Sequence, residues 1–514
     1  MPPRRSTRTT NAAENDTGAS RTRSKRPATS PPPPAPAKRS RARQPQDVHV
    51  EVPIPSKPRT VRKARQEEQE PRAQSLHPPT QPAHERPCWQ LFGWGNNLFC
   101  QLGTGEDGTM SSEPEFPKPT RNRLIEKLIA EGQFGEPGAG LETIAAGALH
   151  NLAISEDGAV WSFGINEHGG LGRPTQEDQD PTPGRIQSLV EEGFRAVRVV
   201  AGDGISAALS DRGVARTWGR YPEADGGFEA FSPDTPKQLT PTSIPDLPEE
   251  RFASIAAGSD HLVLLTLAGE VYTVGCGDSG QLGYRVPHQN PVLGTIPHKV
   301  LRHSRGHRAV TVGAGSSTSF FVDEQGAVWG WGLNHCGQTG TGKLPAAPRP
   351  GHEHDRKKVR NTIVWAPQRV RRVSRAELGD EATVIQIAGG DEHTLFLTSD
   401  GRVFACGSGW AGQLGGGQQI TEKVPEPVPV TFPHDVAEDP IVQVACGARV
   451  SAAVTRAGVL YTWGSNTSAQ IGVVDAPAEV TTPTVIVRRE GSWRAKVVSC
   501  GSQHCVALLQ KKAQ

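Results

Sequence analysis

The sequence contains no long apolar run, and this absence argues against a membrane-spanning or secreted protein. No stretch approaches the about 18 consecutive apolar residues that a membrane-spanning helix needs. No apolar segment near the amino terminus has the length of a signal-peptide core either. We therefore expect a soluble, intracellular protein with no membrane partner.

Close cysteine pairs are also missing. The eight cysteines include no Cys-x-x-Cys pair, which is the spacing typical of zinc and redox sites. This absence predicts no metal site and leaves the cysteines to be interpreted as small core residues.

Aromatic residues are absent from residues 1–86, which differ in composition from the rest of the chain. This segment carries 18 Lys and Arg against 8 Asp and Glu, whereas the remainder carries 38 against 46. It also contains the run Pro31 to Pro34. Such a segment cannot bury enough apolar surface to offset the entropy lost on ordering. We predict a disordered basic tail over 1–86.

Two glycine-centred signatures repeat along the rest of the chain. The first, Ala/Cys-Gly followed three residues later by His or an equivalent, has its glycine at Gly147, Gly202, Gly258, Gly315, Gly390, Gly447 and Gly501. The second is an aromatic-rich strand that ends in a glycine and is followed eight residues later by another, at 95/103, 164/172, 219/227, 275/283, 332/340, 407/415 and 464/472. In the six complete copies the two signatures are 17 residues apart. Short strands repeating at this period are typical of a β-propeller.

The two ends of the repeat region complement each other. Trp89 to Gly103 contains only the second signature, and Val498 to Leu509 contains only the first. Together they would form one blade, closing the ring and removing its exposed sheet edge. We predict an all-β, seven-bladed propeller over 87–514 and expect a monomer. Cys446 and Cys500 fall at repeat positions where other copies carry alanine, in agreement with a core role.

Two glycine-rich segments resemble nucleotide-binding motifs without fitting them. Gly275 to Gly280 matches the dinucleotide fingerprint, but no helix pattern follows it. Gly337 to Lys343 matches a P-loop as far as its lysine, but Leu344 replaces the hydroxyl residue that would bind Mg²⁺. Both coincide with glycines of the repeat, so we expect no nucleotide and no other cofactor.

The repeat histidines and the residues beside them are candidates for function. One repeat position carries a histidine in four copies: His150, His261, His393 and His504. These histidines could act on a partner, or they could be half-buried side chains that bond to neighbouring backbone. Carboxylates follow three of the first-signature glycines in Asp203, Asp260 and Asp391. If these carboxylates gather at one opening of a propeller, they would bind a basic partner. The alternative is that they are ordinary solvent-exposed loop residues without a binding role.

Basic clusters occur in two places. Lys25 and Arg26, eleven further residues, and then Lys38, Arg39, Arg41 and Arg43 have the spacing of a bipartite nuclear import signal. Such clusters also bind nucleic acid non-specifically. The second place is an insertion at about 343–383, which lengthens the spacing from Gly315 to Gly390 to 75 residues, against 54 to 57 elsewhere.

The repeat region resembles the regulator of chromosome condensation family. Segments peculiar to that family are similar to Ser162 to Arg173, Asp260 to Val263 with Tyr272 to Gly277, and Ser304 to His307. The resemblance covers 89–510 and includes a basic tail before the propeller. It implies a seven-bladed guanine-nucleotide exchange factor for the Ran GTPase that works without bond-making chemistry. It also implies a nuclear, chromatin-associated protein that importin carries into the nucleus.

The resemblance also implies site residues. The acidic residue tied to exchange would be Asp260, and the second catalytic position, a histidine in the family, is Glu392 here. The partner-binding set would be Asn96, His150, Asp203, Arg220, Tyr221, Glu223, Asp225, Arg285, Asp391 and His504. The set for chromatin or DNA would be Pro2, Arg4, Arg5, Arg302 and Arg305, with Pro2 a candidate for amino-terminal methylation. Because Glu392 reverses a charge, a non-catalytic scaffold tethered to chromatin is the alternative.

The import signal can be tested by its second cluster. Replacing Lys38, Arg39, Arg41 and Arg43 with Ala should leave more of the protein in the cytoplasm, because the cluster supplies charges that the importer reads. Fluorescence imaging of the tagged protein measures the ratio of nuclear to cytoplasmic signal. Unchanged nuclear accumulation would show that import uses another route.

Overall fold

The computed structural model describes the repeat region and a few residues before it. The described residues are 76–80, 83–103, 114–166, 168–176, 179–222, 228–230, 239–247, 249–287, 294–301, 308–342, 344, 362–379, 382–417 and 422–512. All of them belong to one compact unit, Arg72–Gln514, and the other unit, Met1–Pro71, lies outside the described residues. The tail and its import signal are therefore not part of the structural description.

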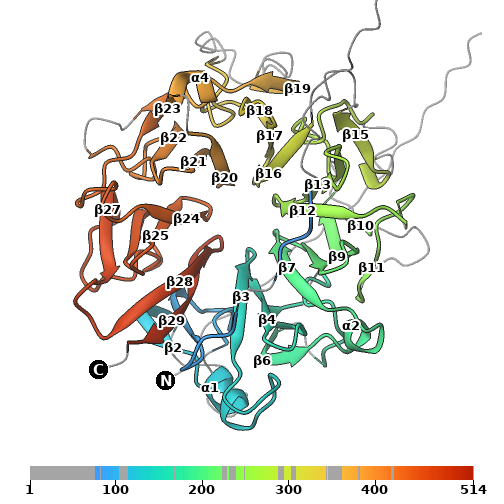
Figure 1. Cartoon of the computed structure of the whole chain (residues 1–514), viewed down its shortest axis with the longest axis vertical. Helices are drawn as coiled ribbons and strands as arrows, with labels where there is room; N and C mark the ends of the chain where they lie inside the picture. The colour runs from blue at the N-terminus through green and yellow to red at the C-terminus, as the bar shows by residue number, and fades with distance from the viewer. Residues whose placement is uncertain are drawn as a thin grey trace, which may run out of the picture. The chain divides into compact units, whose positions relative to one another are not determined.

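The compact unit is a ring of seven antiparallel blades around a common centre (Figure 1). Blade 1 contains β3 (Leu141–Ala146), β4 (His150–Ser155), β5 (Val160–Ile165) and β6 (Gln179–Arg185). Blade 2 contains β7 (Ala196–Ala201), β8 (Ile205–Ser210), β9 (Ala215–Pro222), β10 (Phe228–Ala230) and β11 (Thr242–Ser243). Blade 3 contains β12 (Phe252–Ala257), β13 (His261–Thr266), β14 (Val271–Gly275) and β15 (His298–Leu301).

The remaining blades follow the same order from the centre outward. Blade 4 contains β16 (Ala309–Gly315), β17 (Thr318–Asp323), β18 (Val328–Leu333) and β19 (Ile363–Arg369). Blade 5 contains β20 (Val384–Gly389), β21 (His393–Thr398), β22 (Val403–Ser408) and β23 (Lys423–Pro429), and blade 6 contains β24 (Ile441–Cys446), β25 (Val450–Thr455), β26 (Leu460–Ser465) and β27 (Glu479–Val487). The helices of the described part are short: α1 (Arg123–Ala130), α2 (Gln187–Glu191) and α4 (Arg375–Leu378).

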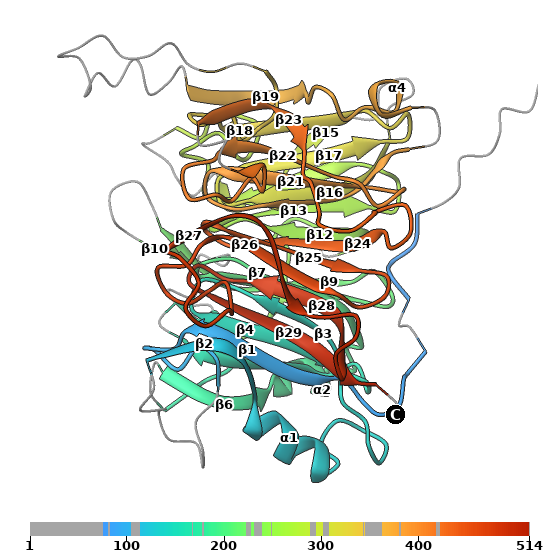
Figure 2. The ribbon, with the colours of Figure 1, turned by 90° about the vertical axis from the view of Figure 1, so that its left-hand side faces the viewer.

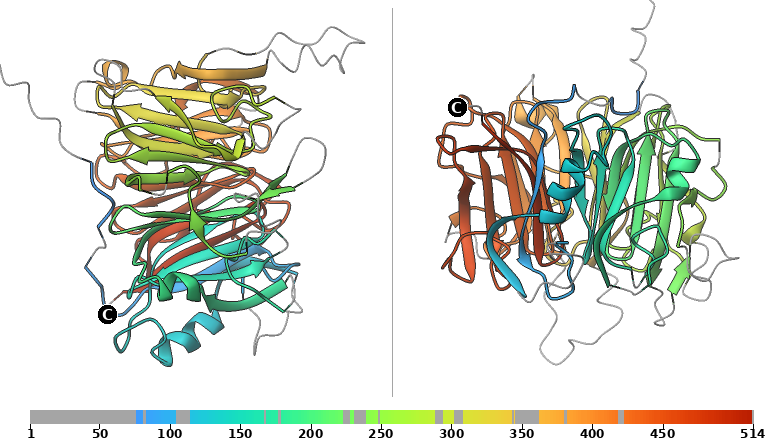
Figure 3. Two further views of the ribbon diagram at one scale, coloured as in Figure 1. Left: turned by 90° about the vertical axis from the view of Figure 1, so that its right-hand side faces the viewer. Right: turned by 90° about the horizontal axis from the view of Figure 1, so that it is seen from below.

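Blade 7 joins the two ends of the repeat region, as the sequence predicted. It consists of β2 (Glu115–Arg121), β1 (Gln90–Asn96), β29 (His504–Lys511) and β28 (Trp493–Cys500) in that spatial order. The register between β1 and β29 runs from Gln90 opposite Leu509 to Gly95 opposite His504. Figure 2 and the right panel of Figure 3 show these blue and red strands side by side. The all-β propeller and its closure are therefore confirmed.

Tryptophans of the second signature link four of the blades to the one before. Trp94, Trp218, Trp331 and Trp463 are fully buried. Each indole N–H donates to a backbone carbonyl of the preceding blade, for example Trp218 to Gly170 at 2.8 Å and Trp331 to Gln281 at 2.9 Å. A buried indole needs such an acceptor, because an unpaired N–H in the core would destabilise the fold. The repeated tryptophan therefore fixes the spacing between blades.

Glycines of the first signature form the innermost contact between blades. A Cβ atom on Gly147 would lie closer than 3.0 Å to the carbonyl oxygen of Gly202, and one on Gly202 would lie as close to that of Gly258. The series continues around the ring until Gly501 meets the carbonyl of Gly147. Only glycine permits this approach of backbone to backbone.

The segment before the propeller packs on the end of the blades opposite these glycines. Arg86 donates two hydrogen bonds of 3.0 Å to the buried carboxylate of Glu156, and His84 lies 2.9 Å from Glu142. Leu76 packs against the core between blades 3 and 4. The compact unit therefore begins before the predicted boundary at residue 87.

Part of the predicted insertion belongs to the propeller itself. Its residues 363–369 form β19, the outer strand of blade 4, and 375–378 form α4. Arg371 and Arg372 of the basic stretch pair with Glu426 of blade 5. Residues 345–361 of the insertion, including the basic run Arg356, Lys357 and Lys358, lie outside the described residues. No helix in the described part of the chain is long and apolar enough to cross a membrane.

Because these glycines are so tightly packed, adding a single methyl group to one of them should strongly destabilise the fold. Gly202→Ala would place Cβ against two backbone oxygens of blade 3 and should lower the free energy of unfolding by about 3 kcal/mol. Gly491→Ala is the milder control, since its Cβ would meet one atom, Arg488 O at 3.2 Å, with the next atoms at 3.9 Å. Chemical denaturation measures both variants, and equal stabilities would contradict the packing role of the ring.

Candidate functional site

The turns that follow the first-signature glycines surround one opening of the ring. A pocket there is lined by all seven glycines together with Asp203, Asp391, Ser259 and Ser316. Backbone hydrogen bonds link the turns, such as Asp203 N to Ser259 O at 2.8 Å and Asp391 N to Ala448 O at 3.1 Å. We call this end of the propeller the acidic face, because its charged turn residues are mainly carboxylates.

Three carboxylates interact at the acidic face. Burial, and then the negative charge of Asp203, raise the pKa of Asp260 to about 7. Burial likewise raises the pKa of Asp203, against a hydrogen bond from Ser259 that favours its charged form. The pKa of Asp391 is raised by burial and then by Asp203, while Ser316 and Arg449 oppose the shift. Crowded carboxylates of this kind favour a cationic partner group, which would relieve their repulsion.

The repeat histidines are structural. Ser206 donates its hydroxyl to Gly170 O, so it accepts a hydrogen bond from His150 Nε2 at 2.8 Å. His261 and His393 make the same contact with serines of the next blade, and His504 Nε2 lies 3.2 Å from Asn151 Oδ1. Burial lowers the pKa of all four imidazoles, to about 3 or 4.

This burial corrects the expectation that His150 and His504 contact a partner. Their side chains are 2% and 0% exposed, so they cannot reach a bound protein. Their polar bonds run between blades and hold the turns of the acidic face in place.

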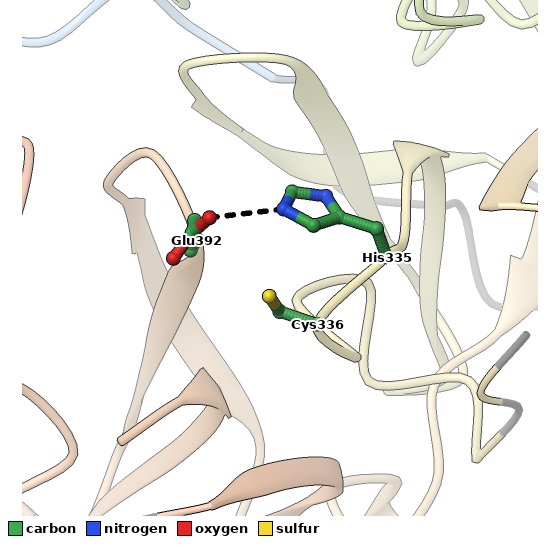
Figure 4. Close-up of side chains that lie close together, drawn as sticks. All are labelled: His335, Cys336 and Glu392. Atoms are coloured by element: carbon green, nitrogen blue, oxygen red, sulfur yellow. Dashed lines mark hydrogen bonds and ion pairs between the residues drawn. The ribbon is translucent and has the colours of Figure 1, made fainter. Parts of the chain in front are cut away.

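Glu392 differs from its repeat equivalents in its partners. Its carboxylate lies 2.9 Å from Nε2 of His335, which belongs to the turn after β18 in the preceding blade (Figure 4). Cys336 lies beside them, and ligand atoms of the three residues fall within 4.8 Å of one another. Burial, with the charge of Glu392, raises the pKa of the Cys336 thiol to about 11. Donor types suited to a transition metal are therefore present in this group, while the absence of a metal site stays a prediction of the sequence.

A second group of possible ligands lies away from the acidic face. His84, Glu142 and Glu156 come together where the segment before β1 meets blade 1. Arg86 and Lys496 already neutralise the two buried carboxylates of this group. Their arrangement is that of an ion-pair network that anchors the segment.

The other predicted partner residues are distributed around the acidic face. Asn96 shapes its turn by accepting from Leu98 N at 2.8 Å and donating to Gln503 at 3.3 Å. Arg220 lies near the end of β9 on the same face, where its backbone N–H donates to Gly204 O at 2.9 Å. The guanidinium of Arg285 stacks on the Trp365 ring at 4.8 Å, which ties it to β19.

Several predicted residues cannot be placed. The side chain of Tyr221 and the residues Glu223, Asp225, Arg302 and Arg305 lie outside the described part of the structure, as do Pro2, Arg4 and Arg5. Sequence reasoning missed His335, Gln338 and Arg449. Their repeat positions could have identified them, since each stands in a turn whose equivalents in other blades line the acidic face.

Comparison with known proteins agrees with this architecture. Residues 90–507 match the family model of the RCC1-like domain. The human regulator of chromosome condensation is 32% identical over 385 residues, covering 72% of this chain and 82% of the human protein. The guanine nucleotide exchange factor SRM1 of Saccharomyces cerevisiae is 26% identical over 453 residues, covering 81% of this chain and 86% of SRM1.

Solved structures of yeast Prp20 share the fold. One, described with its binding properties to Gsp1p and histones, has a TM-score of 0.70 at 25% identity and covers 85% of this chain and 94% of Prp20. Another, bound to Kap60, has a TM-score of 0.71 at 25% identity and covers 89% and 97% of the two chains. With the matched domain, the shared ring and the relatives at this level of identity, the chain belongs to the regulator of chromosome condensation family.

Proposed function

We propose that this protein is a guanine-nucleotide exchange factor for a Ran-type small GTPase. The observation that carries the proposal is the set of crowded carboxylates Asp203, Asp260 and Asp391, held on one face of a rigid ring. The family supports it, since the similar protein SRM1 is named an exchange factor and Prp20 is described with its binding to Gsp1p.

The mechanism needs binding energy and no covalent step. A GTPase that holds its nucleotide with picomolar affinity gives up about 16 kcal/mol on release, so the exchange factor must stabilise the empty form comparably. The acidic face holds like charges close together, with Asp260 partly buried, and cationic groups of the GTPase would relieve their repulsion. Because the turns are fixed by inter-blade hydrogen bonds, little ordering entropy is lost on binding.

We further propose that the protein works on chromatin in the nucleus. Residues 1–86 carry ten more positive than negative charges, which favours DNA, and their paired basic clusters favour an importin. Prp20 is described as binding histones and was solved with Kap60, in line with both partners.

The second candidate function is a non-catalytic propeller scaffold on chromatin. The identity of Glu392 favours it, because the family resemblance implies a histidine at this position and the glutamate reverses its charge. An exchange assay separates the two functions, since a scaffold would leave nucleotide release unchanged.

Asp260 provides the first test of the exchange function. Asp260→Ala should slow the nucleotide release that this protein catalyses on the GTPase about tenfold or more, because it removes a carboxylate that acts on the partner rather than on the core. Release of a fluorescent nucleotide from a purified Ran-type GTPase measures the effect. Asp211→Ala is the control, since Asp211 is exposed in the turn between β8 and β9, away from the acidic face. Wild-type exchange by Asp260→Ala would refute the site assignment.

The pKa of Asp260 predicts the pH dependence. If the charged carboxylate is required, exchange should rise with pH through about 7, and Asp260→Asn should flatten this rise. Burial disfavours the charge in the folded state, so the native protein holds an extra proton between the unfolded pKa of about 4 and about 7. Stability relative to Asp260→Asn should therefore fall as pH rises through this range. Parallel stability curves for the two proteins would contradict the raised pKa.

A further inference from the structure

A chain of hydrogen bonds connects three side chains across the boundary between blades 4 and 5. The amide of Gln338 lies 3.3 Å from His335 Nδ1, and His335 Nε2 lies 2.9 Å from the carboxylate of Glu392 (Figure 4). His335 and Glu392 are each about a third exposed, with side-chain values of 34% and 30%. The chain therefore runs from the interior of a turn to the surface of the acidic face.

The direction of each hydrogen bond follows from one fixed donor. The backbone N–H of Cys336 can only donate, and it lies 2.9 Å from Gln338 Oε1, which must accept. The NH₂ group of Gln338 then faces His335 Nδ1, so Nδ1 accepts and the ring proton resides on Nε2. His335 Nε2–H consequently donates to Glu392.

This tautomer argues against a metal at the same three ligands. A metal on His335 would need an unprotonated Nε2, whereas Gln338 keeps the proton there. The Cys336 thiol would also have to lose a proton that burial stabilises. The contacts fit a hydrogen-bonded relay better than a metal centre.

Both ends of the relay are anchored to backbone. Lys423 Nζ donates to His335 O at 3.1 Å, and the turn of His335 is closed by Asn334 Oδ1, which accepts from Thr339 N at 3.1 Å. On the other blade, Glu392 O accepts from Ser408 N at 2.8 Å. The relay is thus held from both blades, and the Glu392 carboxylate is fixed by a neighbour rather than left to rotate freely.

We propose that His335 and Gln338 are positioning residues that orient Glu392 to receive a lysine or arginine side chain of the GTPase. Glu392 is near enough to Asp391 to raise the pKa of that carboxyl, so the two acids form a continuous negative rim. The other titratable groups beside these acids are Lys423, Arg449 and the Cys336 thiol, which is neutral. The assignment rests on the proposed exchange function and extends it to a cationic contact at the boundary between blades 4 and 5.

A double-mutant cycle tests this positioning role. His335→Ala should raise the KM for the GTPase about three- to tenfold, with kcat little changed, because an oriented charge is lost from binding. In a Glu392→Ala background the same substitution should have no further effect, since the positioned group is gone. His335→Gln keeps an N–H donor of similar reach and should largely restore the wild-type KM.

Controls separate the relay from the exchange function itself. Glu438→Gln changes an exposed glutamate between β23 and β24, at the end of the blade away from the acidic face, and should behave as wild type. ¹⁵N-histidine NMR of the full chain reports the His335 tautomer without any GTPase, with His335→Gln identifying its signals. The relay predicts a proton on Nε2, and Gln338→Ala should shift the tautomer balance.

The outcomes are distinct. If wild type accelerates release, additive effects of His335→Ala and Glu392→Ala would overturn the positioning role, as would a proton on Nδ1. If wild type does not accelerate release, the proposed function fails together with the GTPase contact, while the NMR result still decides whether the relay exists.

Discussion

The contact on which the rest of the structure depends is the approach of backbone to backbone between first-signature glycines. Each glycine leaves no room for a Cβ atom beside the next blade, and the series closes from Gly501 to Gly147. This contact sets the radius of the ring and brings seven turns around one opening. The buried tryptophans and histidines then fix how far apart neighbouring blades stand at larger radius. A change at the glycines would therefore move every turn of the acidic face.

Such a scaffold explains how like charges are kept together. Asp203, Asp260 and Asp391 destabilise one another, and burial adds to the cost of their ionisation. A flexible loop would separate them, but these residues stand one or two positions after glycines that cannot move. The free energy stored in this arrangement becomes available when a cationic partner binds. The fold and the proposed function thus use neighbouring positions of one repeat: histidine binds the blades together, and the acids beside it are the residues we propose to meet the partner.

The spacing of the glycines was sufficient to predict seven blades and the closure by β1 and β29, because this backbone contact admits no other residue. The outer strand β19 was assigned to an insertion, since outer strands carry neither signature. His150 and His504 were expected at a partner surface, but repeat position alone does not show whether a polar side chain meets solvent or the next blade. His335 and Gln338 were missed because their pairing with Glu392 joins residues of different blades, which the sequence separates by 57 positions.

The central claim is that the acidic face releases nucleotide from a GTPase. Stopped-flow release of a fluorescent guanine nucleotide from a purified Ran-type GTPase, with the full chain present in substoichiometric amount, tests this claim most directly. We expect release to become much faster than from the GTPase alone, with each molecule of this protein acting on many molecules of GTPase. A release rate that does not change when the protein is added would contradict it.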